Sequence, residues 1–355
     1  MWPDMRIQDL LGIELPIIQA PMAGANGTAM AIAVAQAGGL GSLPCAMLSV
    51  EQLRQQFASI RRATPKPINL NFFCHRAPTV DAAREAQWQQ QLAPYYRELG
   101  IDADAPIASA SRAPFDQRYC ELVEELKPEV VSFHFGMPDA VLLDRVRASG
   151  AKVLSSATTV AEARWLEARG CDAVIAQGAE AGGHRGMFLS TDVATQIGTF
   201  ALLPQIVDAV RVPVIASGGI ADARGIVAAF ALGAAAVQIG TAYLLTPEAT
   251  ISPVHRAALL QAQDDQTALT NLFSGRPARG IVNRLMREQG PISDKVPDFP
   301  LAGGALAPLR AKAEPAGSGD FMSLWSGQAA RLAVAMPAGE LTRKLAAEAL
   351  AQLQR

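Results

Sequence analysis

The 355-residue sequence has few cysteines, few charged residues and no long apolar run, and each shortage excludes a class of protein. The four cysteines form no CxxC pair, so neither a metal site nor a disulfide framework is expected. Lys and Arg are scattered and the formal net charge is −2, so we expect no nucleic-acid partner. No apolar run reaches about 18 residues, and the N-terminal residues lack a sustained apolar stretch. We therefore expect no membrane span, no secretory signal and a cytoplasmic location.

Half of the residues are hydrophobic, which supplies a large core and excludes disorder as the main state. Short apolar runs alternate with Ala-rich amphipathic segments, as is typical of a parallel sheet buried on both faces. Eight such units favour an α/β fold of the (β/α)8 TIM-barrel type over a doubly wound sheet. The predicted strands are 16–20, 40–43, 68–72, 130–134, 152–155, 173–177, 213–217 and 235–239, and the predicted helices are 28–37, 50–63, 117–126, 140–148, 160–168, 202–209 and 223–232.

Two segments interrupt this alternation. Residues 74–115 form a polar insertion after the third strand, and residues 247–320 follow the eighth. Loops of this length usually have a function, so we interpret them as walls or a lid over a pocket, with a dimer contact or ordered decoration as the alternative. Residues 321–355 are predicted to form two C-terminal helices, at 321–335 and 339–354. We expect one domain over residues 1–355, as a monomer or a homodimer.

Glycine turns at the ends of the last two strands indicate a phosphate site. Gly218 and Gly219 follow the seventh strand, and Gln238, Gly240 and Thr241 end the eighth. Glycines let backbone N–H groups approach a phosphate, and barrels of this type bind phosphate at this point. Sugar phosphates, nucleotides and FMN all fit such a site, whereas tight helix–strand packing is the structural alternative.

Histidines follow two other strands. His184 lies in a loop with three glycines after the sixth strand, where a group that titrates near neutrality can act as a general base. His134 ends the fourth strand and is a second catalytic candidate if it lies beside His184 in the barrel mouth, with a hydrogen-bonded barrel histidine as the alternative. We expect His75 and His255 in solvent or in the lid. Asn71 ends the third strand with an amide suited to a heteroaromatic edge.

Seven motifs, in this order, resemble the nitronate monooxygenase family, formerly called 2-nitropropane dioxygenases, over roughly residues 10–335: PIIQAPMAG, NLNFF, SFHFG, AEAGGHRG, ASGGI, QIGTAYL and LWSGQ. The AGGHRG loop and the FMSLWSGQ segment most resemble its class I, which oxidises propionate 3-nitronate. The resemblance implies a non-covalent FMN and assigns the catalytic base to His184. The matching cofactor positions are Met22 and Gly24 beside the isoalloxazine, Asn71 and Gln177 at its edge, Gly182 near the flavin chain, Gly218, Gly219, Gln238, Gly240 and Thr241 at the phosphate, and Ser326, Gly327 and Gln328 completing that site.

The implied reaction converts an alkyl nitronate and O2 into a carbonyl product and nitrite, without reduced nicotinamide. An FMN-dependent NAD(P)H enoyl-thioester or quinone reductase on the same barrel is the alternative, and a non-redox phosphate-binding barrel is a third. The sequence departs from class I in its substrate pocket, where tyrosines and a lysine are expected. Tyr243 fits one tyrosine, Phe299 offers no hydroxyl, and Lys295 and Lys312 are candidate cations for a substrate carboxylate.

Overall fold

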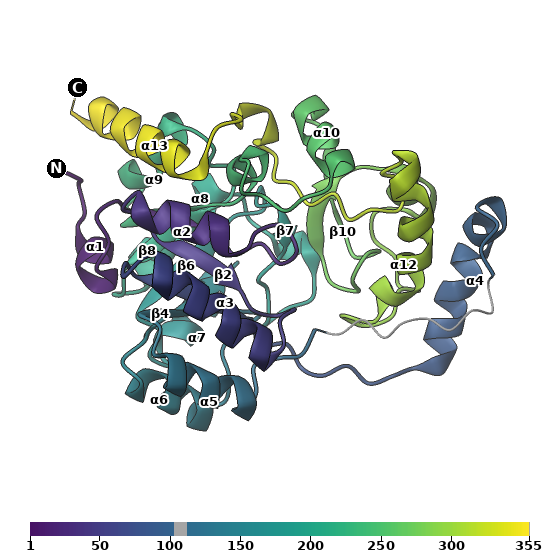
Figure 1. Cartoon of the computed structure of the whole chain (residues 1–355), viewed down its shortest axis with the longest axis horizontal. Helices are drawn as coiled ribbons and strands as arrows, with labels where there is room; N and C mark the ends of the chain where they lie inside the picture. Colours follow the sequence, from purple (N-terminus) through teal and green to yellow (C-terminus); the bar gives the residue numbers. More distant parts are fainter. Residues whose placement is uncertain (103–111, 355) are drawn as a thin grey trace.

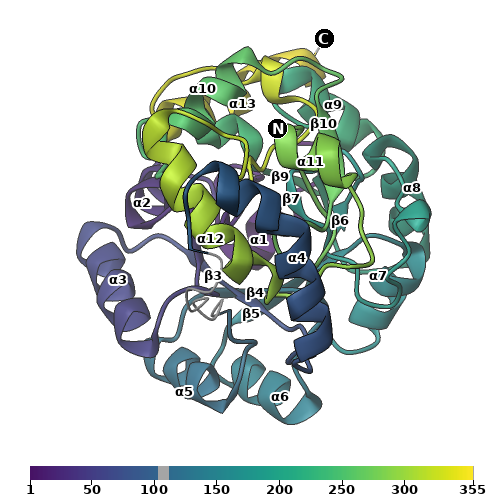
Figure 2. The same ribbon diagram turned by 90° about the vertical axis from the view of Figure 1, so that its right-hand side faces the viewer.

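Eight parallel strands close into a barrel in the computed structural model, which describes residues 1–102 and 112–354 (Figures 1 and 2). The strand order is β1-β9-β8-β6-β5-β4-β3-β2, and Ile18 pairs in parallel with Leu40 to join β1 to the β2 side. The predicted barrel is therefore confirmed, with every predicted strand present within two residues. The strands are β1 (Ile17–Gln19), β2 (Gly41–Pro44), β3 (Ile68–Phe73), β4 (Val130–His134), β5 (Lys152–Ala157), β6 (Ala173–Gln177), β8 (Val214–Ser217) and β9 (Ala236–Ile239).

Helices cover the outside of the barrel. Most begin at a side chain that caps the first turn, and Ser49 forms a capping box with Gln52 at the start of α3. Such caps contribute about 1 kcal/mol each to helix stability. Because capping residues are recognisable in the sequence, several helix starts were predicted correctly. The helices around the barrel are α1 (Arg6–Leu11), α2 (Thr28–Gln36), α3 (Val50–Ala63), α5 (Gln117–Leu126), α6 (Ala140–Ala148), α7 (Val160–Glu167), α8 (Thr199–Ala209), α9 (Ala223–Ala231) and α13 (Ala338–Leu353).

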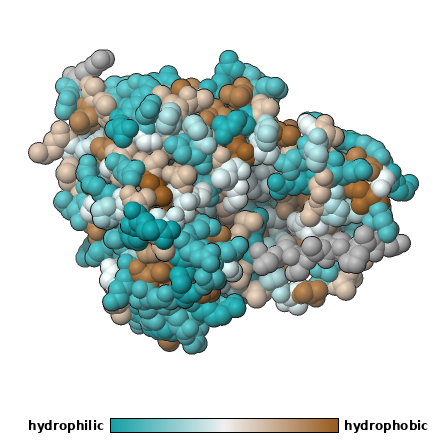
Figure 3. All heavy atoms as spheres, viewed as in Figure 1, coloured by the Kyte–Doolittle hydropathy of each residue, from teal (hydrophilic) through white to brown (hydrophobic). Residues whose placement is uncertain are grey.

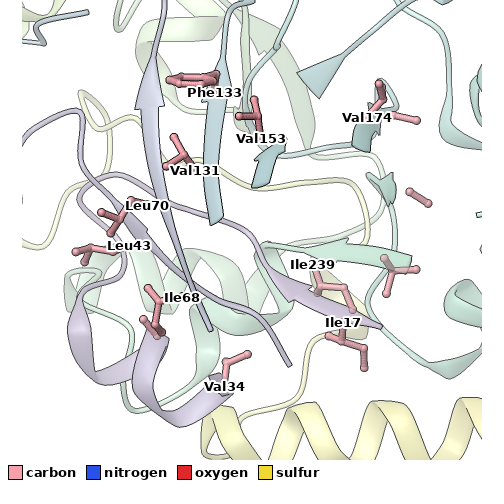
Figure 4. Close-up of a cluster of buried hydrophobic side chains, with 14 of the residues drawn as sticks. Ile17, Val34, Leu43, Ile68, Leu70, Val131, Phe133, Val153, Val174 and Ile239 are labelled. Atoms are coloured by element: carbon pink, nitrogen blue, oxygen red, sulfur yellow. The ribbon is translucent and has the colours of Figure 1, made fainter. Parts of the chain in front are cut away.

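The strands are apolar on both faces because each face packs against a different layer. Outward residues such as Ile17, Leu70 and Val131 pack under the helices (Figure 4). Their neighbours Ile18 and Val130 belong to a separate core cluster with Ile7 and Leu11 of α1. Alternation with a period of two distributes consecutive strand residues between these two cores.

A smaller unit covers the C-terminal ends of the strands. Helices α4 (Ala82–Glu98) and α12 (Ala302–Ala313) pack together and lie across that end in both views (Figures 1 and 2). Aromatic residues of α4 make this contact. The Tyr96 hydroxyl donates to the Ala305 carbonyl at 2.6 Å, and Trp88 packs in the same hydrophobic cluster. The part of the predicted insertion at residues 103–111 lies outside the described residues.

A three-stranded antiparallel sheet, which the sequence did not predict, connects this cover to the barrel. Its order is β10 (Thr267–Thr270), β11 (Ala278–Ile281), β7 (Gly183–His184), so it carries the histidine of the glycine-rich loop. The remaining elements are α10 (Pro253–Gln261), α11 (Arg284–Gln289) and the 3-10 turns η1 (Val193–Thr195), η2 (Thr241–Leu245), η3 (Glu314–Ala316) and η4 (Ala330–Leu332).

The prediction of a helix at 321–335 is wrong. This segment is largely irregular, with only the short turn η4, whereas α13 confirms the second C-terminal helix. Residues near 324 pair with β11 instead, since the Ile281 amide donates to the Leu324 carbonyl at 2.8 Å and Gly280 bridges to Trp325. A non-local strand contact has overridden the local helical pattern.

The face of the molecule seen in Figure 3 has apolar residues scattered among hydrophilic ones. Across residues 1–102 and 112–354, none of the helices combines the length and the apolar character needed to traverse a membrane. Within the same residues no three His, Cys, Asp or Glu side chains are grouped as metal ligands.

Candidate active site

A cavity of about 300 Å³ opens at the C-terminal ends of the barrel strands. The glycine turns after β8 and β9 form one side, and the β7 loop and residues of the cover form the other. The structure thus brings together most of the predicted site residues, although they come from seven strands and turns. Those that line the cavity are Met22, Gly24, Asn71, His134, Gln177, Gly182, His184, Gly218, Gly219, Gln238, Gly240 and Thr241.

The glycine turns present backbone N–H groups to this cavity. Gly218 and Gly219 have φ values of 117° and 71°, which side-chain-bearing residues rarely adopt. The amides of Gly218, Gly219 and Gly240 donate to no acceptor among the described residues. Gly218 and Gly240 are half-buried and Gly219 is exposed, so their N–H groups are open to a ligand on one wall of the cavity, as in the backbone concavities that bind anions.

Two side-chain amides have free acceptors on the same walls. The Gln238 carbonyl oxygen is buried and without a partner among the described residues. Asn71 donates from Nδ2 to the Ser132 carbonyl at 3.2 Å and to the Ser132 hydroxyl at 2.9 Å. Because a carbonyl can only accept, the Asn71 amide nitrogen must face Ser132, which leaves its oxygen for a ligand.

The Gln177 side chain joins the end of β6 to the loop that follows it. Its Nε2 donates to the His184 carbonyl at 3.0 Å, and its Oε1 accepts from the Gly186 amide at 2.6 Å. Arg185 is fully buried and donates to the Gln177 and Gly178 carbonyls at 2.6 Å each. The end of β6 and the following loop are therefore fixed to each other, and this contact positions His184.

His184 is half-buried on the cavity wall and hydrogen-bonded through one ring nitrogen. Its Nε2 lies 2.8 Å from the Ser274 hydroxyl, in the turn between β10 and β11. Nδ1 makes no hydrogen bond to the described residues. Burial lowers the pKa of His184 well below 6.5, and the positive charge of Arg112 lowers it further. The imidazole is therefore neutral at physiological pH, the state in which histidine can accept a proton.

His134 combines the two alternatives, because it lines the cavity beside His184 and its ring is hydrogen-bonded within the barrel. Its Nε2 lies 3.1 Å from the His184 carbonyl oxygen, and its Nδ1 lies 3.0 Å from the Ser156 hydroxyl. A carbonyl can only accept, so the proton is on Nε2, and Nδ1 accepts from Ser156. Burial lowers the pKa of His134 to about 4. Both nitrogens are occupied, so His134 supports the His184 backbone.

Phenylalanine rings form the outer part of the site. Phe299 lies 5.4 Å from the His184 ring between centroids, and Phe73 lies 6.4 Å from it. Trp325, from the irregular C-terminal segment, lies 5.4 Å from His184. These rings surround the imidazole with apolar surface, which contributes to the desolvation that lowers the pKa of His184.

The expectation that His75 and His255 lie in solvent or in the lid is wrong about their exposure, because both are buried. His75 packs with its ring centroid 4.8 Å from that of Phe299, and its two ring nitrogens have no hydrogen-bond partner among the described residues. His255 lies 3.0 Å from the Trp325 carbonyl and supports that segment. The insertion therefore contributes to the hydrophobic core, although its amino-acid composition is polar.

Several positions do not match their predicted placement. Ser326 is fully buried and donates to the Gly327 carbonyl, and Gln328 is exposed, so neither side chain reaches the cavity wall. Gly327, predicted together with them, does line the wall, because this turn packs against Gly182: a Cβ on Gly182 would lie 2.5 Å from the Gly327 nitrogen. Tyr243 is buried away from the cavity, with its hydroxyl 2.7 Å from that of Thr342.

The cations of the site were also missed by sequence reasoning. Neither Lys295 nor Lys312 lines the cavity, whereas Arg112 and Arg310 do. Arg112 precedes a buried phenylalanine at the end of the insertion, and no strand or glycine pattern marks it. Ser274 lies in a GRP turn between two short β-prone runs, a signal that could have indicated the small sheet but not its contact with His184.

A parallel barrel with unpaired amides after its last two strands and a neutral histidine on the same cavity is typical of barrel enzymes that bind their ligand at the C-terminal ends of the strands. Comparison with known proteins shows the family. The family model "Nitronate monooxygenase" matches residues 4–348. A nitronate monooxygenase of Pseudomonas aeruginosa is 43% identical over 345 residues, covering 97% of this chain and 98% of that protein.

Solved structures agree. Nitroalkane oxidase from Streptomyces ansochromogenes has a TM-score of 0.88 and 38% identity, covering 98% of this chain and 99% of that one. FabK from Thermotoga maritima is more distant, with a TM-score of 0.73 and 28% identity over 98% of this chain and 97% of its own. The chain belongs to the nitronate monooxygenase family, whose members are flavin-dependent oxidoreductases.

Proposed function

We propose that this protein is an FMN-dependent nitronate monooxygenase that converts propionate 3-nitronate and O2 into a carbonyl product and nitrite. The observation that carries the proposal is the unpaired amides of Gly218, Gly219 and Gly240 on the same cavity as the neutral imidazole of His184. The first group fits a phosphate, and the second fits a general base.

The residues present fit FMN. The three amides would hold its phosphate, and the buried oxygen of Gln238 and the side-chain oxygen of Asn71 would accept hydrogen bonds from the ring system. Met22 and Gly24 would flank the isoalloxazine, with Gly182 near the flavin chain and Thr241 beside the phosphate. Bound FMN supplies the redox chemistry between the nitronate and O2.

His184 would remove a proton from carbon when a neutral nitroalkane binds in place of a nitronate. When the Ser274 hydroxyl donates to the Arg276 carbonyl, 3.3 Å away, its oxygen receives the Nε2 proton of His184. Nδ1 then keeps its lone pair as the basic atom. Because the surroundings lower the pKa of His184, the base is weak, which favours the preformed nitronate as the better substrate.

We also propose that residues 1–355 form one domain. Arg112 of the insertion, Ser252 of the segment after β9 and Trp325 of the C-terminal segment all line the same cavity as the barrel residues. Removing either insertion would open the wall of the site.

The test is turnover of propionate 3-nitronate by the purified protein in air without NAD(P)H. We expect O2 consumption and nitrite release. Absence of nitrite from any alkyl nitronate would contradict the proposal. Turnover of an enoyl thioester or a quinone with NAD(P)H would favour the reductase alternative.

A further inference from the structure

Arg112 is a cation on the cavity wall without a counter-charge among the described residues. Its guanidinium forms no ion pair and no hydrogen bond there, and its side chain lies over the Phe299 ring with Cζ 5.6 Å from the centroid. Burial lowers the pKa of Arg112, although the group stays charged at physiological pH. A desolvated charge without a partner is costly, so this position calls for an anionic ligand.

The other arginines near the cavity, half-buried Arg276 and exposed Arg310, already have partners. Arg276 donates to the Met187 carbonyl at 2.5 Å and lies over Phe135, with Cζ 4.1 Å from that centroid. Arg310 lines the cavity but forms an ion pair with Glu314 at 3.0 Å. Among the arginines of residues 1–102 and 112–354 that line the cavity, Arg112 is therefore the one available to a ligand.

Arg112 and His184 share one aromatic wall. The His184 ring lies 5.4 Å from the Phe299 centroid, and the Arg112 guanidinium lies 5.6 Å from the same centroid. No hydrogen bond joins the two residues, and Arg112 is the first of the charges that lower the pKa of His184. Phe299 is buried and does not line the cavity, so it supports both side chains from within the protein. A ligand that reaches both must therefore carry two polar groups separated by a short spacer.

We propose that Arg112 binds a carboxylate on the substrate and makes the site selective for short nitronates with an anionic group at the far end. This inference rests on the proposed function and adds its specificity-determining residue. A guanidinium can donate two parallel hydrogen bonds to a carboxylate, which a lysine cannot reproduce. Phe299 lacks a hydroxyl, and Lys295 and Lys312 do not line the cavity, so Arg112 takes the carboxylate-binding role.

The test uses Arg112→Gln, which removes the positive charge and keeps a long polar side chain. We compare propionate 3-nitronate with 1-propyl nitronate, which has the same three-carbon chain and no carboxylate. Loss of a charge-assisted hydrogen bond corresponds to about a 10- to 100-fold change, so KM for propionate 3-nitronate should rise by that factor. Neither its kcat nor the KM for 1-propyl nitronate should change by more than about twofold. Arg112→Lys should recover part of the loss.

Arg84→Gln is the matched control. Arg84 on α4 forms an ion pair with Asp298 at 3.0 Å, beside Phe299 but outside the cavity. Its loss tests whether loosening the cover alone changes selectivity, and we expect equal effects on both substrates. Equal losses on both substrates in Arg112→Gln, or no loss at all, would overturn the proposal. Selective loss in Arg276→Gln with none in Arg112→Gln would overturn it as well.

Binding of propionate, followed by saturation-transfer NMR, separates this proposal from the proposed function. The wild-type protein should bind propionate more tightly than propionamide, and Arg112→Gln should lose that preference. If no nitronate is turned over but the preference and its loss are seen, the carboxylate site stands and the proposed function fails. If nitronates are turned over and Arg112→Gln binds propionate as the wild-type protein does, the carboxylate site is wrong.

Discussion

The Nε2 atom of His184 lies 2.8 Å from the hydroxyl of Ser274, a residue 90 positions later in the chain. This contact joins β7 to the turn between β10 and β11, so the small sheet both carries the imidazole and fixes its rotation. The Ser274 hydroxyl also lies 3.3 Å from the Arg276 carbonyl, which is the acceptor that its proton needs.

Ser274→Ala should weaken the orientation of His184 without removing it. One net hydrogen bond contributes about 0.5–1.5 kcal/mol, so kcat/KM on a neutral nitroalkane should fall about 2- to 10-fold. Flavin content should be unchanged, because Ser274 does not line the cavity. The measurement is kcat/KM across pH with flavin occupancy recorded in parallel. An unchanged pH profile and rate would show that Ser274 has no part in orienting the base.

His184→Asn should separate proton removal from the steps that follow it. Loss of a general base typically costs about 10²–10⁴-fold, so oxidation of a neutral nitroalkane should fall by that order. Activity on the preformed nitronate should fall less, because no C–H proton has to be removed. Steady-state rates on a nitroalkane and on its nitronate give the comparison. Equal losses on both would mean that His184 positions the substrate or stabilises its charge instead.

Gly219→Asp should expel FMN, because it places a carboxylate beside the backbone donors proposed for the phosphate and strains a residue at φ 71°. Gly317→Asp is the control for strain alone: its φ is 80°, and nothing lies within 4 Å of its Cβ position. Flavin released by heating and measured per mole of folded protein should be lost in the first variant and kept in the second. Stoichiometric FMN in Gly219→Asp would disprove the placement of the phosphate.

The buried histidines should make stability fall as the pH falls below neutrality. His75 has a pKa of about 4 in the folded protein against 6.5 as its ordinary value, because it is buried. Between these values the unfolded chain binds more protons, so the free energy of unfolding rises with pH and is lost on acidification. One such group contributes up to about 2 kcal/mol of loss between pH 7 and pH 5.

His75→Leu tests this directly, because the imidazole it removes has no hydrogen-bond partner among the described residues. Denaturant titrations at pH 7 and pH 5 should show a smaller drop in unfolding free energy for the variant than for the wild-type protein. An identical pH dependence in both proteins would contradict the assignment of the titration to His75.

The barrel could be predicted from the sequence because its signals are local. Each strand is a short apolar run, most helices around the barrel start at a cap such as Asp116 or Asp139, and the glycine turns after β8 and β9 mark the predicted phosphate side. These features depend on a few neighbouring residues, so they can be recognised in the sequence before the fold is known.

The contacts that define the site could not be predicted in the same way. His134 contacts the His184 backbone across 50 positions, and Ser274 contacts its ring across 90. The 321–335 segment has a helical pattern, yet it pairs with β11, and the polar insertion carries the buried His75. In each case a distant partner decides the conformation, and no spacing in the sequence encodes that partner.

The most direct test of the account mixes the purified, flavin-loaded protein under anaerobic conditions with propionate 3-nitronate in one sample and NADH in another, while the visible flavin spectrum is recorded. We expect the nitronate to change the flavin spectrum within the turnover time. Admitting air should restore the spectrum with release of nitrite, and NADH should leave it unchanged. Rapid bleaching by NADH with no response to the nitronate would contradict the account.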